Sequence, residues 1–423
     1  MKKRQSKERL YDRNFTILVL GQIISLFGSA IQRFAFSLYI LDLTGSAGLF
    51  STILAFSMIP IIVMSPIAGV LSDRVSKKSI MVWLDFISAG LILGYTLLLL
   101  SGQSGVIAIA ILMFLLSGIS TVYQPAVTAS IPGVVSEENL LKANSVVQQV
   151  SSLSNFLGPI LAGMLYGLFG ILGIVIVNGF SFLASAIMEL FLHIPQIKRE
   201  NTEGAYHIFK KDMTEALRYL RYENLVVLRM TFSSGLFNLF LVPVFSVVTP
   251  FVIMVSFEQT STVYGITEGA IALGMIIGAL FVGLLKRHVP IQAIYKVLYL
   301  VSLSMVGMAL ILYLEKRTIT TEVAIIGYAL CGMLIMGAIG YANVVSATYL
   351  QQATRPDMLG KISAFGAGFA TLCVPLGQVL FGGVIELLAN SMFILMLFAA
   401  CSTFLVTLFV RWNVRHIKKE YEN

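Results

Sequence analysis

Twelve long apolar stretches divide the chain, and they constrain its fold more than any other feature. Each has about 20 or more residues, the length that a helix needs to cross the roughly 30 Å hydrocarbon core of a membrane. The stretches lie at about 15–41, 47–71, 79–100, 105–131, 143–167, 170–194, 225–254, 261–285, 291–314, 321–349, 360–388 and 391–411. Those at 225–254 and 321–349 are long enough to tilt or kink. The sequence predicts an all-α integral membrane protein with twelve transmembrane helices.

Positive charges between these stretches predict the orientation of the chain. Only 12% of the 423 residues are charged, about half the share in soluble domains. Of the 29 lysines and arginines, 25 fall in segments that are cytoplasmic if the N-terminus is inside. This bias predicts that both termini are cytoplasmic. Because the basic residues occupy short segments between helices, the net charge of +8 predicts a lipid bilayer as partner and no nucleic acid.

A polar gap after the sixth stretch divides the helices into two sets of six. We predict an N-terminal six-helix bundle over 1–194, a cytoplasmic central loop over 195–224 and a C-terminal six-helix bundle over 225–423. Within the loop, apolar residues recur at three- and four-residue spacing, which predicts an amphipathic helix on the inner membrane surface; a disordered linker is the alternative. These apolar residues are Ile208, Phe209, Met213, Leu217 and Leu220.

The loop between the second and third stretches carries a recognisable motif. Residues 69–78 read Gly-Val-Leu-Ser-Asp-Arg-Val-Ser-Lys-Lys. This resembles the loop signature of the major facilitator superfamily, with Ser76 in place of a glycine. The resemblance implies the twelve-helix fold of that family and a charged cluster that braces the two bundles, whereas simple anchoring by positive charge is the alternative role. The residues concerned are Gly69, Asp73, Arg74, Lys77 and Lys78.

The fifth stretch is similar to the antiporter signature of the same family. It contains Gly158 and Pro159, with serine or alanine at three of the glycine positions. Small residues permit close helix packing and proline bends a helix, so an ordinary packing kink is the alternative. Within the family this signature marks exporters more often than importers. Softer patterns, such as Tyr123-Gln-Pro-Ala126, resemble the macrolide-efflux branch of drug/proton antiporters, and siderophore exporters and lysophospholipid transporters share some of them.

Polar residues at helical spacing predict the substrate pathway. Lipid does not tolerate a polar stripe, so such a stripe indicates a cavity or a neighbouring helix. In the family the first, fourth, seventh and tenth helices line the cavity. Hydrogen bonding between helices, worth about 0.6 kcal/mol per pair, is the alternative. The predicted pathway residues are Gln22, Ser25, Ser29, Gln32, Arg33, Thr121, Gln124, Gln148, Asn155 and Asn238.

Charged residues inside apolar stretches are candidates for function because each costs about 2.5–3.5 kcal/mol at the helix centre. Arg33 is the candidate functional cation, and pairing with Asp42 near the membrane surface is the alternative. Glu268 is the leading candidate for proton coupling, and a paired carboxylate at the outer interface is the alternative. Asp85 is the second candidate, with bonding to the Asp73–Arg74 cluster as its alternative.

Two further acids, Glu189 and Glu386, lie near the ends of their stretches and are interpreted as interfacial. One departure from the drug/proton antiporters is clear, because they carry an arginine in the fourth helix and residues 105–131 contain no charge. A proton route must therefore use other groups.

Together these features predict a secondary transporter of the bacterial cell membrane that exports amphipathic drugs such as macrolides by alternating access. A siderophore exporter, a lysophospholipid flippase and an importer of small solutes are the alternatives. The sequence has no H-E-x-x-H, G-x-S-x-G or P-loop motif, so we predict no enzyme activity, metal or cofactor. The proton gradient is the expected energy source, and a monomer is the expected state.

Overall fold

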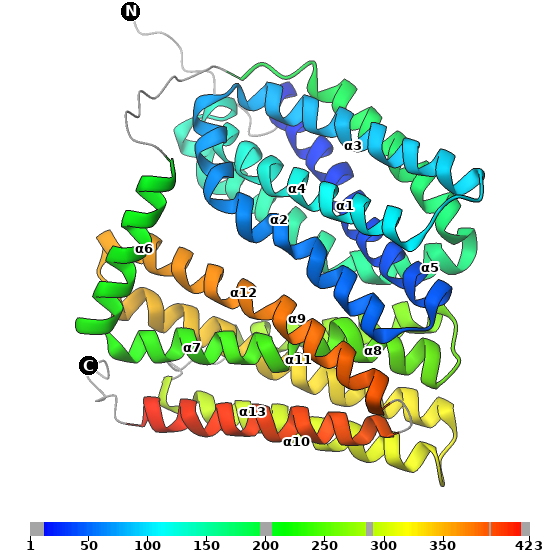
Figure 1. The fold of residues 1–423 in the computed structure, drawn as a ribbon. Coiled ribbons are helices and arrows are strands. Elements are labelled where there is room, and N and C mark those ends of the chain that lie inside the picture. The colour runs from blue at the N-terminus through cyan, green and yellow to red at the C-terminus, as the bar shows by residue number, and fades with distance from the viewer. Residues whose placement is uncertain (1–11, 195–204, 285–290, 389–390, 416–423) are drawn as a thin grey trace, which may run out of the picture. The chain divides into compact units, whose positions relative to one another are not determined.

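The computed structural model describes residues 12–194, 205–284, 291–388 and 391–415, and helices dominate all four ranges (Figure 1). Eleven helices in these ranges are long and apolar enough to cross a membrane. The long helices are α1 (Arg13–Thr44), α2 (Ala47–Arg74), α3 (Lys77–Leu100), α4 (Val106–Val134), α5 (Leu140–Glu189), α7 (Leu225–Phe240), α9 (Ser261–Leu284), α10 (Ile294–Glu315), α11 (Thr321–Ala353), α12 (Pro356–Leu388) and α13 (Met392–Val414).

The eleven candidate spans agree with the twelve predicted stretches because α5 contains two of them. Its apolar span covers 48 residues, about 72 Å at 1.5 Å per residue and therefore more than two bilayer cores. At Gly170 the backbone has φ of 61° and ψ of −174°, which interrupts the helix. Glycine tolerates this conformation because it has no Cβ. The sequence prediction of a break near 167–170 is confirmed.

The seventh predicted stretch is also interrupted, as its length suggested. After α7, the chain forms two π-helical turns, η2 (Val244–Val248) and η3 (Val252–Ser256), which flank the short helix α8 (Thr249–Phe251). Pro250 lies between them and has no N–H to donate to an α-helical hydrogen bond. Thr249 Oγ1 donates to the carbonyl of Val244 at 2.8 Å, an oxygen that also accepts the backbone N–H of Thr249. Such wide turns relieve the strain that proline introduces.

The helices form two compact units. The first unit contains residues 1–40 and 56–208, and the second contains 41–55 and 209–423. In the first unit α3 packs against α4 and α5, and in the second α7 packs against α12, α9 against α11 and α10 against α13. The predicted domain boundaries at 195 and 224 stay a prediction.

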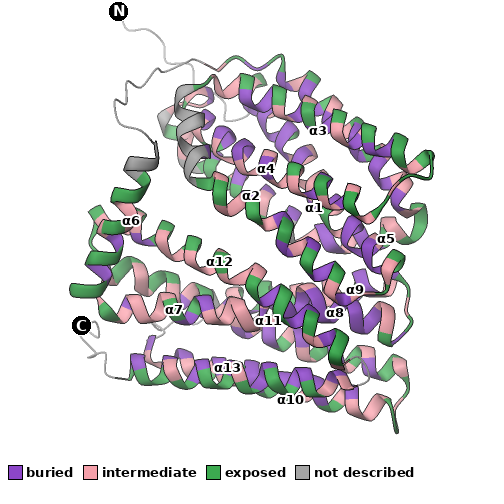
Figure 2. Ribbon diagram, in the orientation of Figure 1, coloured by how far each residue is buried: buried purple, intermediate pink, exposed green. Residues whose placement is uncertain are grey.

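The outward surfaces of the helices are apolar, as a lipid environment requires. Burial alternates along each helix with its turns, so that one stripe faces the unit and the other faces outward (Figure 2). Leucine and isoleucine dominate the outward stripe, with Leu97, Ile107 and Leu387 as strongly exposed examples. In water such surface would be costly, whereas hydrocarbon accepts it.

The predicted amphipathic segment forms α6 (Ala205–Tyr222), and the helix packs on the second unit. Ala216 and Leu220 are fully buried and belong to one cluster with Val227 of α7 and Ile362 of α12. Lys361 Nζ lies 2.8 Å from Asp212 Oδ1 and 2.5 Å from Glu215 Oε2. Further along, Asn224 donates to the carbonyl of Ala353 at 2.7 Å. The helix is therefore held by apolar packing, ion pairs and a hydrogen bond.

Leu220→Ala is expected to loosen α6, because removing a buried leucine side chain costs about 2–5 kcal/mol. Leu217→Ala is the matched control, since Leu217 lies on the same helix and is 45% exposed. Hydrogen exchange followed by mass spectrometry would show faster exchange across residues 209–222 in Leu220→Ala alone. Equal exchange in the two variants would contradict the packing described above.

Candidate functional site in the first unit

A hydrogen-bonded group of polar side chains lies inside the first unit, beginning with Asp85. This residue of α3 is only 1% exposed. Its Oδ2 accepts a hydrogen bond from Ser25 Oγ of α1 at 2.9 Å, and Ser25 Oγ lies 3.3 Å from Ser185 Oγ of α5. Asp85 is about 12 Å along its helix from the first residue. The three hydrogen-bonding side chains therefore join three helices.

Glu189 is the second carboxyl group of this cluster. It is fully buried, and its Oε1 accepts a hydrogen bond from the hydroxyl of Tyr123 of α4 at 2.6 Å. Ser185 lies one helical turn before it, so both side chains share a face. Glu189 is the last residue of α5, so its interpretation as an interfacial residue stays a prediction. Its burial shows that the bundle covers this face of the helix.

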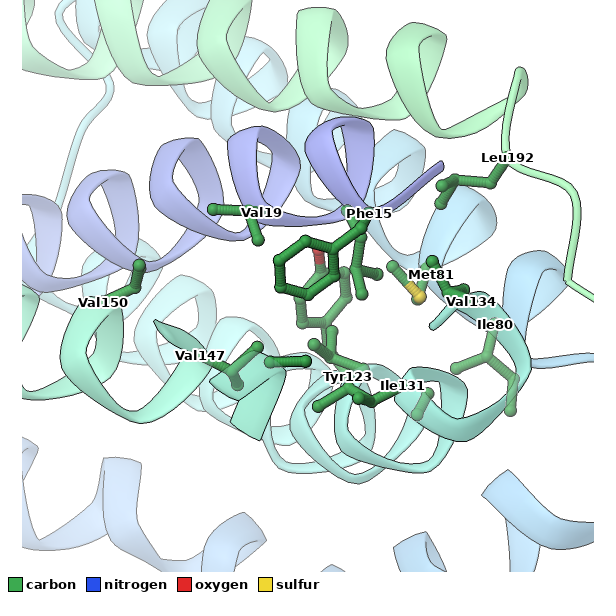
Figure 3. Close-up of a cluster of buried hydrophobic side chains, with 14 of the residues drawn as sticks. Phe15, Val19, Ile80, Met81, Tyr123, Ile131, Val134, Val147, Val150 and Leu192 are labelled. Carbon is green, nitrogen blue, oxygen red and sulfur yellow. The ribbon is translucent and has the colours of Figure 1, made fainter. Parts of the chain in front are cut away.

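An apolar cluster surrounds the tyrosine that binds Glu189. Tyr123 is buried beside Phe15 of α1, with Met81 and Leu192 nearby (Figure 3). These side chains exclude water from one end of the first unit. Hydrogen bonds and charges act more strongly in such surroundings than in water.

Close approach of α1 completes the cluster. A Cβ built on Gly21 would lie 3.1 Å from Glu189 Oε1 and 3.3 Å from Ser185 Oγ, so the glycine brings α1 against this face of α5. The neighbouring Gln22 is fully buried. Neither its amide nitrogen nor its amide oxygen has a hydrogen-bond partner among the described residues, and Glu189 Oε2 also has none. Buried polar atoms without partners are costly, so each calls for an explanation such as a functional role or a bound water molecule.

The other polar residues predicted to share a face of α1 include Gln32, which forms a second contact between helices. Asn178 Nδ2 of α5 donates to Gln32 Oε1, and Asn178 also occupies the space beside Gly28 where a Cβ would lie. Gln32 is buried whereas Ser29 is half-buried. Hydrogen bonding between helices, the alternative role of the stripe, thus applies to Ser25 and Gln32, and their role as cavity-lining residues stays a prediction.

The predicted pathway residues on α4, α5 and α7 do not join this cluster. Thr121 Oγ1 donates to the carbonyl of Ser117 in its own helix at 2.8 Å, Gln124 is half-buried and Gln148 is exposed. The side chain of Asn155 lies outside the described residues. In the second unit, Asn238 Nδ2 donates to the carbonyl of Ala370 at 3.1 Å and so joins α7 to α12.

The two charged candidates outside the cluster lie in different surroundings. The Arg33 side chain is exposed, with its guanidinium carbon 5.9 Å from the ring centre of Phe34. Glu268 of α9 is half-buried, and its Oε2 is a buried atom without a hydrogen-bond partner among the described residues. One turn earlier lies Tyr264, which is buried.

The loop motif lies partly outside the described residues, which include the backbone but not the side chains of Gly69, Asp73 and Arg74. Ser76, which replaces the glycine of the signature, caps α3 by accepting a hydrogen bond from the amide of Ser79 at 3.3 Å. Lys77 and Lys78 follow in the first turn of α3 and are half-buried. The bracing role of this cluster stays a prediction.

The antiporter-like residues of α5 make a close helix contact. A Cβ on Gly158 would lie 2.6 Å from the Cβ of Ala30, so α1 and α5 approach closely at this point. Pro159 is buried beside it. The expected role of Gly158 in close helix packing is confirmed, while the connection of the motif with export stays a prediction.

Glu386 lies near the end of α12, in the second unit. Its Oε1 accepts hydrogen bonds from Ser46 Oγ at 2.5 Å and from the amide of Gly48 at 3.2 Å. These groups begin α2, so an exposed carboxylate of α12 binds the N-terminus of another helix, where the helix dipole favours negative charge.

Comparison with known proteins identifies the family. The model of the Major Facilitator Superfamily matches residues 18–382. The chain belongs to this superfamily of membrane transporters. It is thus a multi-pass protein of the cell membrane, as the loop signature and the helix count predicted.

Several relatives and solved structures agree with this assignment. Macrolide efflux protein A of Streptococcus pyogenes is 26% identical over 86% of this chain and 88% of its own length. The putative bacilysin exporter of Bacillus subtilis is 26% identical over 87% of this chain and 88% of its own length. A bacterial homologue of the iron transporter ferroportin superposes with a TM-score of 0.69 at 18% identity, covering 97% of this chain and all of its own. At this identity the likeness shows the fold alone.

Proposed function

We propose that this protein is a proton-driven exporter of amphipathic antibiotic-like molecules, with macrolides as the first class to test. The observation that carries the proposal is the match, over most of the chain, to proteins named for the export of two different compounds. These are the macrolide efflux protein and the putative bacilysin exporter. A shared framework that serves two such compounds fits an outward transport direction.

Buried carboxyl groups support the choice of protons as the driving ion. Asp85 and Glu189 lie inside the first unit, and Glu268 has a buried oxygen without a partner among the described residues. Burying a charge in a membrane protein is costly, so acids retained there are typical of proton relays. Both the Asp85 cluster and Glu268 stay candidates for the coupling group.

The proposal predicts that cells producing the protein accumulate less erythromycin. The assay uses a bacterium that lacks its own efflux pumps, labelled erythromycin, and a lipophilic cationic dye in parallel. Accumulation should fall relative to cells with an empty vector, and a protonophore should abolish the difference because export would lose its energy source.

The outcomes separate direction, driving force and substrate. A difference that survives the protonophore would contradict proton coupling, and higher accumulation in producing cells would contradict export. Unchanged accumulation of both compounds, at verified protein levels, would overturn the antibiotic-like substrate class. Siderophore or lysophospholipid transport would then be the next function to test.

A further inference from the structure

We propose that Asp85 and Glu189 together form the proton-binding site of this transporter, with Tyr123 as the residue that positions Glu189. This inference rests on the proposed proton-driven export and assigns its coupling group. The sequence had offered Asp85 as a candidate alone and had placed Glu189 at the membrane interface. The structure brings the two acids into one buried cluster.

The first argument is the charge of the cluster. Both carboxyl groups are buried, and hydrogen bonds from Asp85 through Ser25 to Ser185 lead to the face of α5 that carries Glu189. None of the ion pairs among the described residues involves either acid. Burying two negative charges without a cation costs much free energy, and a shared proton removes half of that charge. The cluster is therefore built to hold a proton.

The second argument is the set of groups that face the two acids. From α1 come Gln22 and Ser25, from α4 comes Tyr123, and from α5 comes Ser185. All four are uncharged; Ser25, Ser185 and Tyr123 form hydrogen bonds in the cluster, whereas the buried Gln22 amide has no partner among the described residues. The one histidine near this end, His193, is exposed, and its Nδ1 lies 3.2 Å from the carbonyl of Phe191. No described cation competes with the proton.

The third argument is that the site joins four parts of the first unit. Ser25 donates to Asp85 from α1 to α3, and Tyr123 donates to Glu189 from α4 to α5. A carboxylate only accepts hydrogen bonds, whereas a protonated carboxyl group also donates one. Gain or loss of the proton therefore changes the hydrogen bonds between these helices. This is the property that links proton binding to a change in helix arrangement.

Unpartnered atoms indicate where the proton resides. Glu189 Oε2 and both polar atoms of the Gln22 amide are buried and have no partner among the described residues. Gln22 follows Gly21, the position at which a Cβ would lie 3.1 Å from Glu189 Oε1. A proton on Oε2 would give this buried atom a hydrogen to donate, which a bare carboxylate oxygen lacks. Among the described residues, by contrast, no second carboxyl group is hydrogen-bonded into the surroundings of Glu268.

The test measures proton binding and transport separately. Purified protein in detergent is titrated by infrared difference spectroscopy, which detects the carbonyl band of a protonated carboxyl group without any substrate. The variants are Asp85→Asn, Glu189→Gln and Glu268→Gln, with exposed Glu322→Gln as control. We expect the titration midpoint of the band to move to lower pH in Asp85→Asn and in Glu189→Gln, because the remaining carboxyl group loses its negatively charged neighbour. The midpoint should stay unchanged in Glu268→Gln and in the control.

Transport assays then test coupling. Proteoliposomes carrying Asp85→Asn or Glu189→Gln should lose accumulation of erythromycin driven by a pH gradient, while exchange of erythromycin at equal pH persists. A titration that changes only in Glu268→Gln would overturn the assignment and place the proton on α9. If erythromycin is not transported but the titration midpoint shifts as expected, the proton site stands and the proposed substrate class fails.

Tyr123→Phe tests the same site by a milder change than the acid variants, which could fail to fold. It keeps the ring in the apolar cluster and removes only the hydroxyl. The tyrosine donates to the carboxylate and so favours its charged form. The infrared titration midpoint should therefore move to higher pH in Tyr123→Phe. An unchanged midpoint, with the same thermal stability, would contradict the positioning role of the tyrosine.

Discussion

Gly278→Leu is expected to leave little folded protein in the membrane. Gly274 and Gly278 of α9 form a G-x-x-x-G pair that faces α11, and a Cβ at position 278 would collide with the carbonyl oxygen of Gly337. Gly340 makes a similar approach to the backbone of α9. Helices in membranes associate largely through such close packing. Separating the two backbones should cost about 3 kcal/mol or more, at the upper end of overpacking costs.

The measurement is the amount of monodisperse protein after detergent extraction, followed by its thermal unfolding. Gly383→Leu is the matched control, since Gly383 is a helical glycine of the same unit and a Cβ there meets nothing within 4 Å. The control should be extracted at normal yield. Normal yield and stability of Gly278→Leu would show that α9 and α11 do not pack through their glycines.

The transmembrane helices could be predicted from the sequence because lipid sets their length. Every apolar stretch corresponds to helical structure, including the two that meet at Gly170 within α5. Irregular backbone was harder to foresee. The length of 225–254 suggested a kink, but the two π-helical turns around Thr249 and Pro250 depend on the local geometry of a proline that has no backbone N–H to donate.

The candidate site was predicted less completely, because hydropathy shows that a residue lies within a helix but not which neighbour it faces. Asp85 stood out as a charge in an apolar stretch, whereas Glu189 lay close to a helix end and was interpreted as interfacial. The spacing of Ser185 and Glu189, one turn apart on an otherwise apolar helix, was the available signal. Their meeting with Tyr123 requires three helices to pack together, which no single stretch reveals.

The polar stripe on α1 shows the same limit. Helical spacing correctly placed Gln22, Ser25 and Gln32 on one face, but that face meets α3 and α5 through hydrogen bonds. A stripe toward a cavity and a stripe toward a neighbouring helix have the same periodicity. Only the partner residues, Asp85 and Asn178, distinguish the two.

Gly158→Leu is expected to abolish export, because it would push α1 away from α5 and so separate Ser25 from Ser185 at the carboxyl cluster. Its contact differs in kind from that of Gly278, since a Cβ on Gly158 meets the Cβ of Ala30 at 2.6 Å and no backbone atom closer than 3.6 Å. The milder Gly158→Ala should destabilise the protein by about 1–3 kcal/mol. Thermal unfolding and erythromycin accumulation measure the two effects.

The Cβ of Ala30 can be removed by mutation, whereas the backbone carbonyl that faces Gly278 cannot. The contact at Gly158 can therefore be tested with a compensating second substitution. Ala30→Gly should restore stability and export to Gly158→Ala, although Ala30→Gly alone costs about 1 kcal/mol of helix propensity. Gly94→Ala, where a Cβ meets nothing within 4 Å, serves as the control in the same unit. If Ala30→Gly fails to restore Gly158→Ala, the close approach of α1 and α5 is not what requires glycine at position 158. The antiporter-like motif would then need a different physical explanation, one based on helix bending at Pro159.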